Sequence, residues 1–386
     1  MNPLRLAIVT ETYVPDVNGV ANSLRQLLLA LDPEHFRIQI IRTRPRSAWV
    51  SEHEEVWCRG LTIPMYPDLQ LGLPCARRIR RVWESFSPDI VYIATEGPMG
   101  LSALKEARRR GLPVISAFHT NFHRYSGYYG MGWIRTLTLN WLRRFHNRTA
   151  VTLVPSSDIA NDLREQNFHP VEVLSHGVDC RLFNPRRRQK TLRDQWQATE
   201  QDKVLLYVGR IAAEKNIPLA IRSWQQLRAT QPRLKLVMVG DGPLRAQLAA
   251  EHPDIVFAGV QTGERLAQYF ASADAFIFPS LTETFGLVTL EAMASGLPVV
   301  AFNMAAAALH VCPGVNGELA EGTDDEEFIA AAARLLTLDL QTAGKKAREE
   351  AESASWDAVA VRFESIVRAL LAKKNQRIQS EIHNLV

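Results

Sequence analysis

Short apolar segments alternate with amphipathic segments along almost the whole chain, and this alternation limits the fold more than any other feature. The first apolar segment, LRLAIVT at 4–10, precedes GVANSLRQLLLAL at 19–31, whose leucines recur at the spacing of one helix face. Further segments of strand length follow at 36–43, 89–95 and 113–120. Because strands that alternate with helices form parallel sheets covered by those helices, we expect an α/β fold.

A second series of the same kind starts beyond residue 176. Its apolar segments occupy residues 203–210, 235–242, 255–260, 275–280 and 297–302. The sequence therefore predicts two Rossmann-like, doubly wound parallel-sheet domains, 1–176 and 177–352, and an amphipathic helix in 353–386. Ligands of such sheets bind at the carboxyl ends of the strands, so we expect an active site in a cleft that both domains face.

Composition excludes several classes of protein. Hydrophobic residues make up 46% and charged residues 22% of the 386 positions, which is typical of a globular chain and not of a disordered one. The four cysteines lie far apart in the sequence and form no zinc or redox spacing, which favours a reducing cytoplasm. No signal peptide or membrane-spanning run is apparent. We therefore expect a cytoplasmic protein.

Several common nucleotide-binding and hydrolase motifs are absent. The sequence contains no Walker A motif and no G-x-S-x-G elbow, and VGDGPL at 239–244 lacks the third glycine of a dinucleotide fingerprint. These absences argue against a kinase, a hydrolase and a dehydrogenase. No Asp-x-Asp motif is evident either, so we expect no metal cofactor.

The stretch PSLTETFGLVTLEAMASGLPVV at 279–300 has the pattern of a strand end, a glycine turn and a helix start. The first N–H groups of a helix have no partner within it, and they bind phosphate together with the positive end of the helix dipole. We therefore expect the backbone of Gly286, Leu287 and Val288 to bind a diphosphate. Glycine at 286 would let the anion approach the main chain closely.

Two glutamates, Glu283 and Glu291, flank this turn. A carboxylate at Glu291, inside the helix, can accept hydrogen bonds from both hydroxyls of a ribose, and Glu283 lies where a sugar would be held. A structural alternative is that Glu283 only stabilises the helix dipole, a contribution of about 0.3–1 kcal/mol. That alternative leaves Glu291 within an apolar helix unexplained.

Arg210 ends the strand in VGRIAAEKNI at 208–217, and Lys215 follows five residues later. Arg210 offers a forked guanidinium and Lys215 a compact ammonium, and a diphosphate suits both. The alternative is a pair of surface cations. In the first half, Gly19 ends the loop TETYVPDVNGV, and its backbone would reach the same diphosphate. His119 follows another strand end and would face the cleft, although a lone histidine is more often structural.

With these segments in place, the chain resembles the retaining GT-B glycosyltransferases that carry an E-x7-E element. Glu283 and Glu291 match that element, GRIAAEKN matches the basic pair, DVNGV matches the glycine loop, and HTNFHRY and HGVDCRLFNP match two further segments. TETYVPDVNGV and FHTNFHRYSGYYG are most similar to GDP-mannose-dependent α-mannosyltransferases and to diacylglycerol glycosyltransferases. The resemblance covers essentially the whole chain.

The resemblance implies a reaction and a role for each matched residue. A hexose, first of all mannose from GDP-mannose, moves with retention to a lipid such as diacylglycerol or a phospholipid. Arg210 and Lys215 neutralise the diphosphate, Glu291 holds the ribose, and Glu283 and His119 contact the sugar. Gly19 meets the phosphates, and the last helix crosses back to the first domain. UDP-sugar donors of glucose, glucuronic acid or sulfoquinovose, and soluble or polysaccharide acceptors, stay as alternatives.

One segment departs from the family pattern. Many members have a Gly-Gly pair soon after PVVA, whereas FNMAAAALHV at 302–311 supplies alanines. This difference affects the expected geometry of the donor-side loop.

Positive charge gathers in one part of the first half. Residues 77–148 contain thirteen Lys and Arg against four Asp and Glu. These are either solvated helix faces or a surface that attracts anionic lipid headgroups, which would make the enzyme peripheral on the inner face of the cell membrane. Two further classes are a sugar-nucleotide sensor and a nucleic-acid-binding protein. All the matched carboxylates and cations are present, which argues against a sensor, and no recognition helix or aromatic platform supports nucleic-acid binding.

Overall fold

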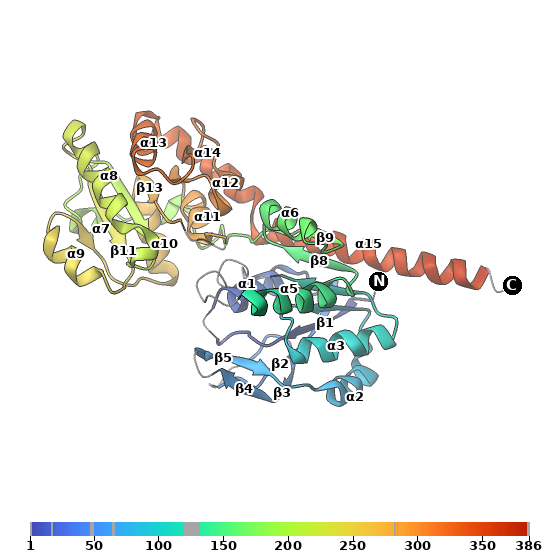
Figure 1. Ribbon diagram of the computed structural model, residues 1–386. Helices are drawn as coiled ribbons and strands as arrows, with labels where there is room; N and C mark the ends of the chain where they lie inside the picture. The colour runs from blue at the N-terminus through green and yellow to red at the C-terminus, as the bar shows by residue number, and fades with distance from the viewer. Residues whose placement is uncertain are drawn as a thin grey trace. The chain divides into compact units, whose positions relative to one another are not determined.

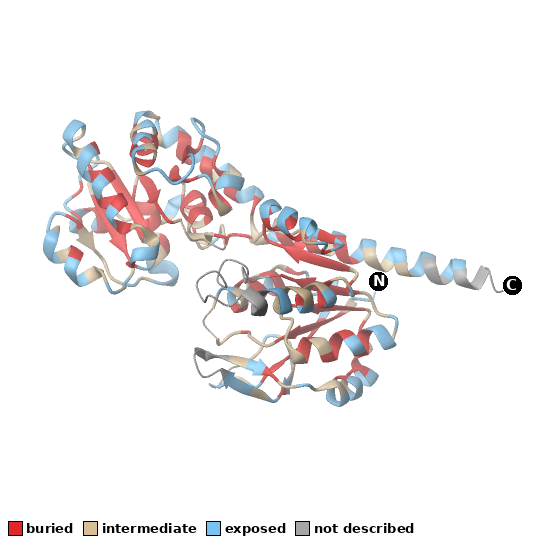
Figure 2. Cartoon of the chain, in the orientation of Figure 1, coloured by how far each residue is buried: buried red, intermediate tan, exposed pale blue. Residues whose placement is uncertain are grey.

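The computed structural model describes residues 2–16, 18–46, 50–63, 66–118, 132–281, 283 and 285–383. The chain divides into two compact units, and each has its own hydrophobic core (Figure 1). The first unit combines Met1–His176 with Trp356–Val386, and the second is Gly177–Ser355. Figure 2 shows that the strands of both units are largely buried.

The described part of the first unit contains a seven-stranded parallel sheet in the order β3-β2-β1-β6-β7-β8-β9. Its strands are β1 (Leu4–Thr10), β2 (Phe36–Thr43), β3 (Glu54–Cys58), β6 (Ile90–Ile93), β7 (Val114–Ala117), β8 (Val151–Val154) and β9 (Val171–Val173). Strands are added outward from β1 on one side and from β6 on the other. The order therefore reverses between β1 and β6, which defines a switch point at their carboxyl ends.

Helices cover both faces of this sheet, as the unbroken apolar run in β1 predicts. Leu6 and Ile8 of β1 pack with α1 (Gly19–Ala30), whereas Ala7 and Val9 pack with α2 (Ala76–Phe86) and α3 (Pro98–Arg109). All four side chains are fully buried, because successive residues of a strand point to opposite faces. The unit also contains α5 (Gly132–His146) and α6 (Ser157–Glu165).

The last helix, α15 (Trp356–His383), packs on the first unit. Its apolar face joins the core that contains the leucines of α1, and Phe363 meets Tyr92 edge to face at 5.5 Å. The helix begins at Trp356, because Ser353 still belongs to the preceding helix α14 (Leu340–Ser353). No described helix of the chain is both long and apolar enough to cross a bilayer.

One small element was not predicted from the sequence. Strands β4 (Gly60–Ile63) and β5 (Tyr66–Gly72) form an antiparallel hairpin that follows edge strand β3. The strand sequences are EEVWC, GLTI and YPDLQLG, so none of the three carries the continuous apolar run of a buried parallel strand.

The second unit, in which only residues 282 and 284 are not described, contains a six-stranded parallel sheet in the order β12-β11-β10-β13-β14-β15. Its strands are β10 (Val204–Val208), β11 (Lys235–Val239), β12 (Val256–Phe257), β13 (Ala275–Phe278), β14 (Val299–Phe302) and β15 (Gly317–Ala320). Its helices include α7 (Lys190–Gln195), α8 (Ile217–Thr230), α9 (Arg245–Glu251), α10 (Gly263–Ser272), α11 (Leu287–Ala294), α12 (Ala305–His310) and α13 (Asp325–Thr337). The strand order reverses between β10 and β13. Two parallel-sheet α/β units confirm the predicted fold class.

Candidate active site

The switch point of the second unit brings together the ends of β10 and β13. Lys215 follows β10, and its ammonium donates to Oε1 of Glu283, which follows β13. The hydroxyl of Ser280 donates to the same oxygen at 2.7 Å. The side chains of Lys215 and Glu283 are 20% and 14% exposed, so the ion pair is largely shielded from water. Two predicted site residues that are far apart in the sequence are therefore in direct contact.

Tyr207 of β10 lies close enough to Glu283 to be influenced by its charge. Its hydroxyl donates to the carbonyl oxygen of Arg210 at 3.0 Å. Burial raises the pKa of Tyr207 well above its usual value, and the nearby charges of Glu283 and Glu214 raise it further. The tyrosine therefore stays neutral and fixes the backbone at Arg210 by donating a hydrogen bond to its carbonyl oxygen.

Helix α11 begins at Leu287, four residues after Glu283. Gly286 precedes its first residue and adopts φ 80°, a left-handed conformation that side chains other than glycine rarely take. No side chain caps this end of the helix, and its first turn contains no acidic residue. The first-turn N–H groups of Leu287 and Val288 are thus oriented as the donors of an anion-binding helix start.

Glu291 lies in the second turn of α11. It is only partly exposed, and burial raises the pKa of its carboxyl to about 7. Within the described residues its carboxylate has no ion-pair or hydrogen-bond partner, whereas its neighbours Leu290 and Ala292 are fully buried. A buried carboxylate without a protein donor is suited to accept hydrogen bonds from ligand hydroxyls.

Arg210 is more exposed than the other residues of this site. Its guanidinium is 66% exposed and pairs with Glu214 at 3.2 Å, four residues along the chain. Its backbone is nevertheless held tightly. The N–H of Ile211 donates to the carbonyl of Asp241 at 2.9 Å, and a Cβ on Gly240 would lie 1.9 Å from the carbonyl oxygen of Gly209.

This contact gives the VGDGPL segment a role that sequence analysis missed. Gly240 lets the loop after β11 pack against the loop after β10, and this packing positions Arg210. The signal was present in the sequence as paired glycines at the ends of two adjacent strands.

Alanines of the segment FNMAAAALHV line the small pocket beside Gly286. Met304 and Ala305 line this pocket with Ser280 and Glu283. Ala305 adopts φ 52°, a left-handed conformation that is unusual for alanine. The departure in sequence therefore places a strained alanine at the site without removing the turn.

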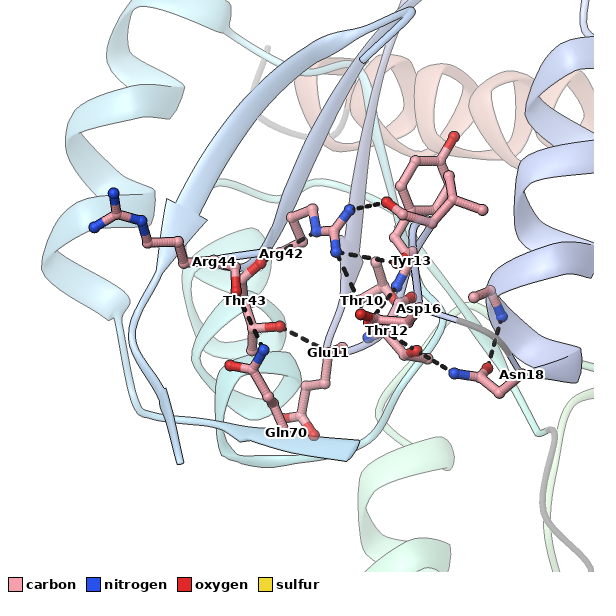
Figure 3. A network of polar contacts seen from close by, with 12 residues as sticks. Thr10, Glu11, Thr12, Tyr13, Asp16, Asn18, Arg42, Thr43, Arg44 and Gln70 are labelled. Atoms are coloured by element: carbon pink, nitrogen blue, oxygen red, sulfur yellow. Dashed lines mark hydrogen bonds and ion pairs between the residues drawn. The ribbon is translucent and has the colours of Figure 1, made fainter. Parts of the chain in front are cut away.

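In the first unit, the loop between β1 and α1 is fixed by side chains within it. Asn18 caps α1 by accepting from the N–H of Ala21 at 2.9 Å, and its amide donates to the hydroxyl of Thr12 at 2.6 Å (Figure 3). Gly19 is the first residue of α1, and a Cβ added there would meet no described atom within 4 Å. Nothing in the described protein therefore requires a glycine at this position.

A buried arginine that the sequence analysis did not identify supports the same loop. Arg42 of β2 is fully buried and donates to the carbonyls of Tyr13 (3.0 Å) and Val14 (Figure 3). Asp16 and Glu55 each lie 3.8 Å from its guanidinium, and together they balance its charge. The available signal was an arginine directly after Ile40 and Ile41 in the strand segment FRIQIIRT, because a buried arginine requires such partners.

His119, the remaining predicted site residue, lies outside the described residues. No cluster of His, Cys, Asp and Glu that could hold a metal ion occurs within the described part of the chain.

Comparison with known proteins agrees with this fold. Residues 17–182 match the family described as Glycosyltransferase Family 4, and residues 202–338 match Glycosyl transferases group 1. A GDP-mannose-dependent alpha-mannosyltransferase of Mycolicibacterium smegmatis is 32% identical over 381 residues, which span 97% of this chain and all of the relative. An alpha-monoglucosyldiacylglycerol synthase of Streptococcus pneumoniae is 30% identical over 316 residues, 77% of this chain and 71% of that protein.

The solved structure of sucrose-phosphate synthase from Thermosynechococcus elongatus superposes with a TM-score of 0.73 at 21% identity, covering 96% of this chain and all of that one. Two parallel-sheet α/β units of this kind place the chain in the class of GT-B glycosyltransferases, to which its structural neighbours belong. Within it, the chain belongs to the group 1 glycosyltransferase family, as its resemblance to E-x7-E enzymes indicated.

Proposed function

We propose that this glycosyltransferase moves mannose from GDP-mannose, with retention of configuration, to a lipid acceptor such as diacylglycerol or a phospholipid at the inner face of the cell membrane. The observation that carries the donor part is the cluster of Lys215, Glu283, Gly286 and Glu291 at one switch point. Relatives named as GDP-mannose-dependent mannosyltransferases and as a diacylglycerol glycosyltransferase support the donor and the acceptor.

Different residues of the second unit contact the diphosphate, the ribose and the sugar of the donor. Lys215 and Arg210 supply positive charge to the leaving diphosphate, together with the N–H groups at the start of α11. Glu291 accepts hydrogen bonds from the ribose hydroxyls, and Glu283 accepts them from the transferred sugar. In the first unit, Gly19 and His119 complete the set of proposed donor contacts.

Lys215 and Glu283 lie where they can stabilise the opposite charges that develop on the diphosphate and on the sugar during transfer. The bond between the anomeric carbon and the diphosphate oxygen breaks as the acceptor hydroxyl adds to the same face, and the diphosphate oxygen takes the proton of that hydroxyl. Negative charge grows on the diphosphate and positive charge on the sugar. A lysine and a glutamate held side by side offer one stabilising charge to each.

Thermal unfolding with added nucleotides tests the donor. GDP is expected to raise the unfolding temperature more than UDP or ADP at equal concentration, because a ligand of the native state stabilises it by mass action. A larger shift with UDP would favour the alternative of a UDP-sugar donor. If no nucleoside diphosphate shifted the transition, the proposed donor site would be wrong.

The acceptor needs a separate assay. Radiolabelled mannose from GDP-mannose should appear in the organic phase when vesicles contain diacylglycerol or phospholipid. Transfer only to soluble sugars would contradict the lipid part of the proposal and leave the donor part intact.

A further inference from the structure

Two of the four cysteines lie together in the first unit. Cys58 is the last residue of β3, and Cys75 immediately precedes α2. Both side chains belong to the same apolar cluster, Cys58 as a buried member and Cys75 as a partly buried neighbour of it. Their thiols hydrogen-bond to each other. The separation of the two residues in the sequence gave no sign of this contact.

The β4–β5 hairpin holds the two cysteines in this position. It begins two residues after Cys58 and ends three residues before Cys75, and its two strands pair in antiparallel register. The N–H of Leu73 donates to the carbonyl oxygen of Arg59 at 2.8 Å, which extends the pairing by one residue toward the cysteines. The backbone therefore brings together the two segments that carry the thiols.

The surroundings of the pair make its two sulfurs unequal. The hydrogen bond from Cys75 lowers the pKa of the Cys58 thiol and the charge of Arg78 lowers it further, although burial opposes both effects. The pKa of Cys75 is raised, first because its S–H donates this hydrogen bond and then because the side chain is buried. A thiolate beside a neutral thiol is the arrangement of a reactive cysteine and its resolving partner.

A small molecule can reach both sulfurs from one side. Cys58 and Cys75 line the same groove of the first unit, and its lining contains no aspartate or glutamate that would disfavour a thiolate there. Cys58 is only 4% exposed, so its sulfur is open to a small oxidant and hindered toward a bulky one. Hydrogen peroxide is small and uncharged, which suits this access.

We propose that Cys58 and Cys75 form a reversible disulfide within the chain when the protein meets hydrogen peroxide. The pair lies in the first unit, apart from the donor cluster of Lys215 and Glu283 in the second unit. The oxidation therefore stands or falls separately from the proposed transfer reaction.

The oxidation takes two steps. The thiolate of Cys58 attacks one oxygen of the peroxide, the O–O bond breaks, and the leaving hydroxide becomes water with the proton that Cys58 released. Cys58 is then a sulfenic acid. The sulfur of Cys75 attacks the sulfur of Cys58, the S–O bond breaks, and the second hydroxide leaves as water with the proton of Cys75. Two thiols are oxidised to one disulfide, and one peroxide is reduced to two molecules of water.

The new bond closes the chain over residues 58–75 and ties the base of the hairpin to the start of α2. Because such a link restricts the unfolded chain, the oxidised protein should unfold at a higher temperature than the reduced one. A dithiol reverses the reaction by exchange and is itself oxidised.

The other two cysteines serve as controls within the same chain. Both belong to the second unit, where the Sγ of Cys180 donates to the carbonyl oxygen of Ala351 at 3.4 Å and Cys312 is exposed. Exposure alone would favour oxidation of Cys312. Preferential oxidation of the partly shielded pair would instead reflect the contact between its two sulfurs.

The test treats the full-length wild type with hydrogen peroxide, blocks the remaining thiols in denaturant and maps the cysteine linkages by mass spectrometry without reduction. A link between Cys58 and Cys75 of one chain is expected to form at least about tenfold faster than Cys312 is oxidised. Dithiothreitol should remove the link. The Cys312→Ser variant should form it at the wild-type rate.

The Cys75→Ser variant tests the order of the two steps. Serine keeps a hydrogen-bond donor beside Cys58 but cannot resolve a sulfenic acid, so dimedone should label Cys58 in this variant and not in the wild type. Circular dichroism checks that the variant is folded. Absence of the label in the folded variant would overturn the assignment of Cys58 as the attacking sulfur.

The wild type alone decides whether the bond forms, so the result does not depend on how well a variant folds. Oxidation of Cys312 while Cys58 and Cys75 stay reduced would overturn the proposal. Links that join other cysteines, or that join two chains, would overturn it as well. None of these outcomes would change the binding of a nucleoside diphosphate, so the donor proposal is tested independently.

Discussion

Lys215 and Glu283, 68 residues apart in the chain, form an ion pair at the switch point of the second sheet. Ser280 holds the same carboxylate oxygen at 2.7 Å, so the orientation of Glu283 is fixed from two sides. Both charged side chains are mostly shielded from water, which strengthens their interaction relative to an exposed pair. The contact links the basic segment after β10 to the acidic segment before α11, and the donor proposal depends on this link.

Glu291 makes donor binding depend on pH. Burial raises its pKa to about 7, and only the ionised carboxylate can accept hydrogen bonds from both ribose hydroxyls. The affinity for GDP should therefore increase by up to about tenfold between about pH 6 and pH 8, as the ionised fraction rises. The measurement is calorimetric titration of the wild type and Glu291→Gln at each pH.

The nucleotide phosphate titrates equally with either protein, so the ratio of the two affinities isolates Glu291. Stability should show the opposite trend. A carboxyl whose folded pKa is raised stabilises the fold below its unfolded pKa and loses that contribution as pH rises through about 7. A pH profile of GDP binding shared by both proteins would contradict the assigned role.

Arg42 is expected to be the most sensitive position in the first unit. Arg42→Gln leaves the carbonyls of Tyr13 and Val14 and the carboxylates of Asp16 and Glu55 without their shared donor. The free energy of unfolding should fall by about 3–5 kcal/mol, measured by urea denaturation. Arg44→Gln is the matched control, because that side chain is exposed, and its effect should stay within about 0.5 kcal/mol. Comparable losses in both variants would show that Arg42 does not organise the loop.

Gly19→Ala tests whether a substrate approaches the backbone at the start of α1. An added Cβ meets no described protein atom, and alanine suits a first helical turn better than glycine does, so stability should hold or rise slightly. Transfer activity should nevertheless fall by about tenfold or more, because the methyl group would displace a phosphate held by the main chain. Full activity in a folded Gly19→Ala protein would show that the donor does not contact the backbone at this residue.

Ala305→Gly should stabilise the protein. A left-handed conformation costs alanine about 1–2 kcal/mol. Replacing alanine by glycine removes this cost, but the greater freedom of glycine in the unfolded chain offsets part of the gain. With φ 52° at Ala305, we expect a net gain of about 0.5–1 kcal/mol in thermal or urea unfolding. Ala308→Gly, in the exposed part of the same helix, should lose about 0.5–1 kcal/mol instead. A loss at both positions would mean that Ala305 is not strained.

Much of the fold could be predicted because the sequences of buried parallel strands are nearly continuous apolar runs. LRLAIVT and VLLYV each show the pattern, and each becomes a central strand. The hairpin after β3 could not be predicted, because neither GLTI nor YPDLQLG is a continuous apolar run.

Part of the local structure at the candidate site could also be predicted. Gly286 was identified as a glycine turn before a helix, and Glu291 as a carboxylate within an apolar helix, and the structure places both at α11. The pairing of Lys215 with Glu283 and the support of the 10–18 loop by Arg42 depend on tertiary contacts, which residue spacing does not encode.

Single-turnover transfer of mannose from GDP-mannose to diacylglycerol vesicles tests the central claim most directly. Lys215→Ala and Glu283→Gln should each slow transfer by about 10²–10³-fold, since both act on charge that develops in the transition state. Lys346→Ala, which breaks an exposed lysine–glutamate pair of the same unit, should react at the wild-type rate. Near-wild-type rates in both site variants, with the proteins folded, would contradict the assignment of this ion pair to the active site.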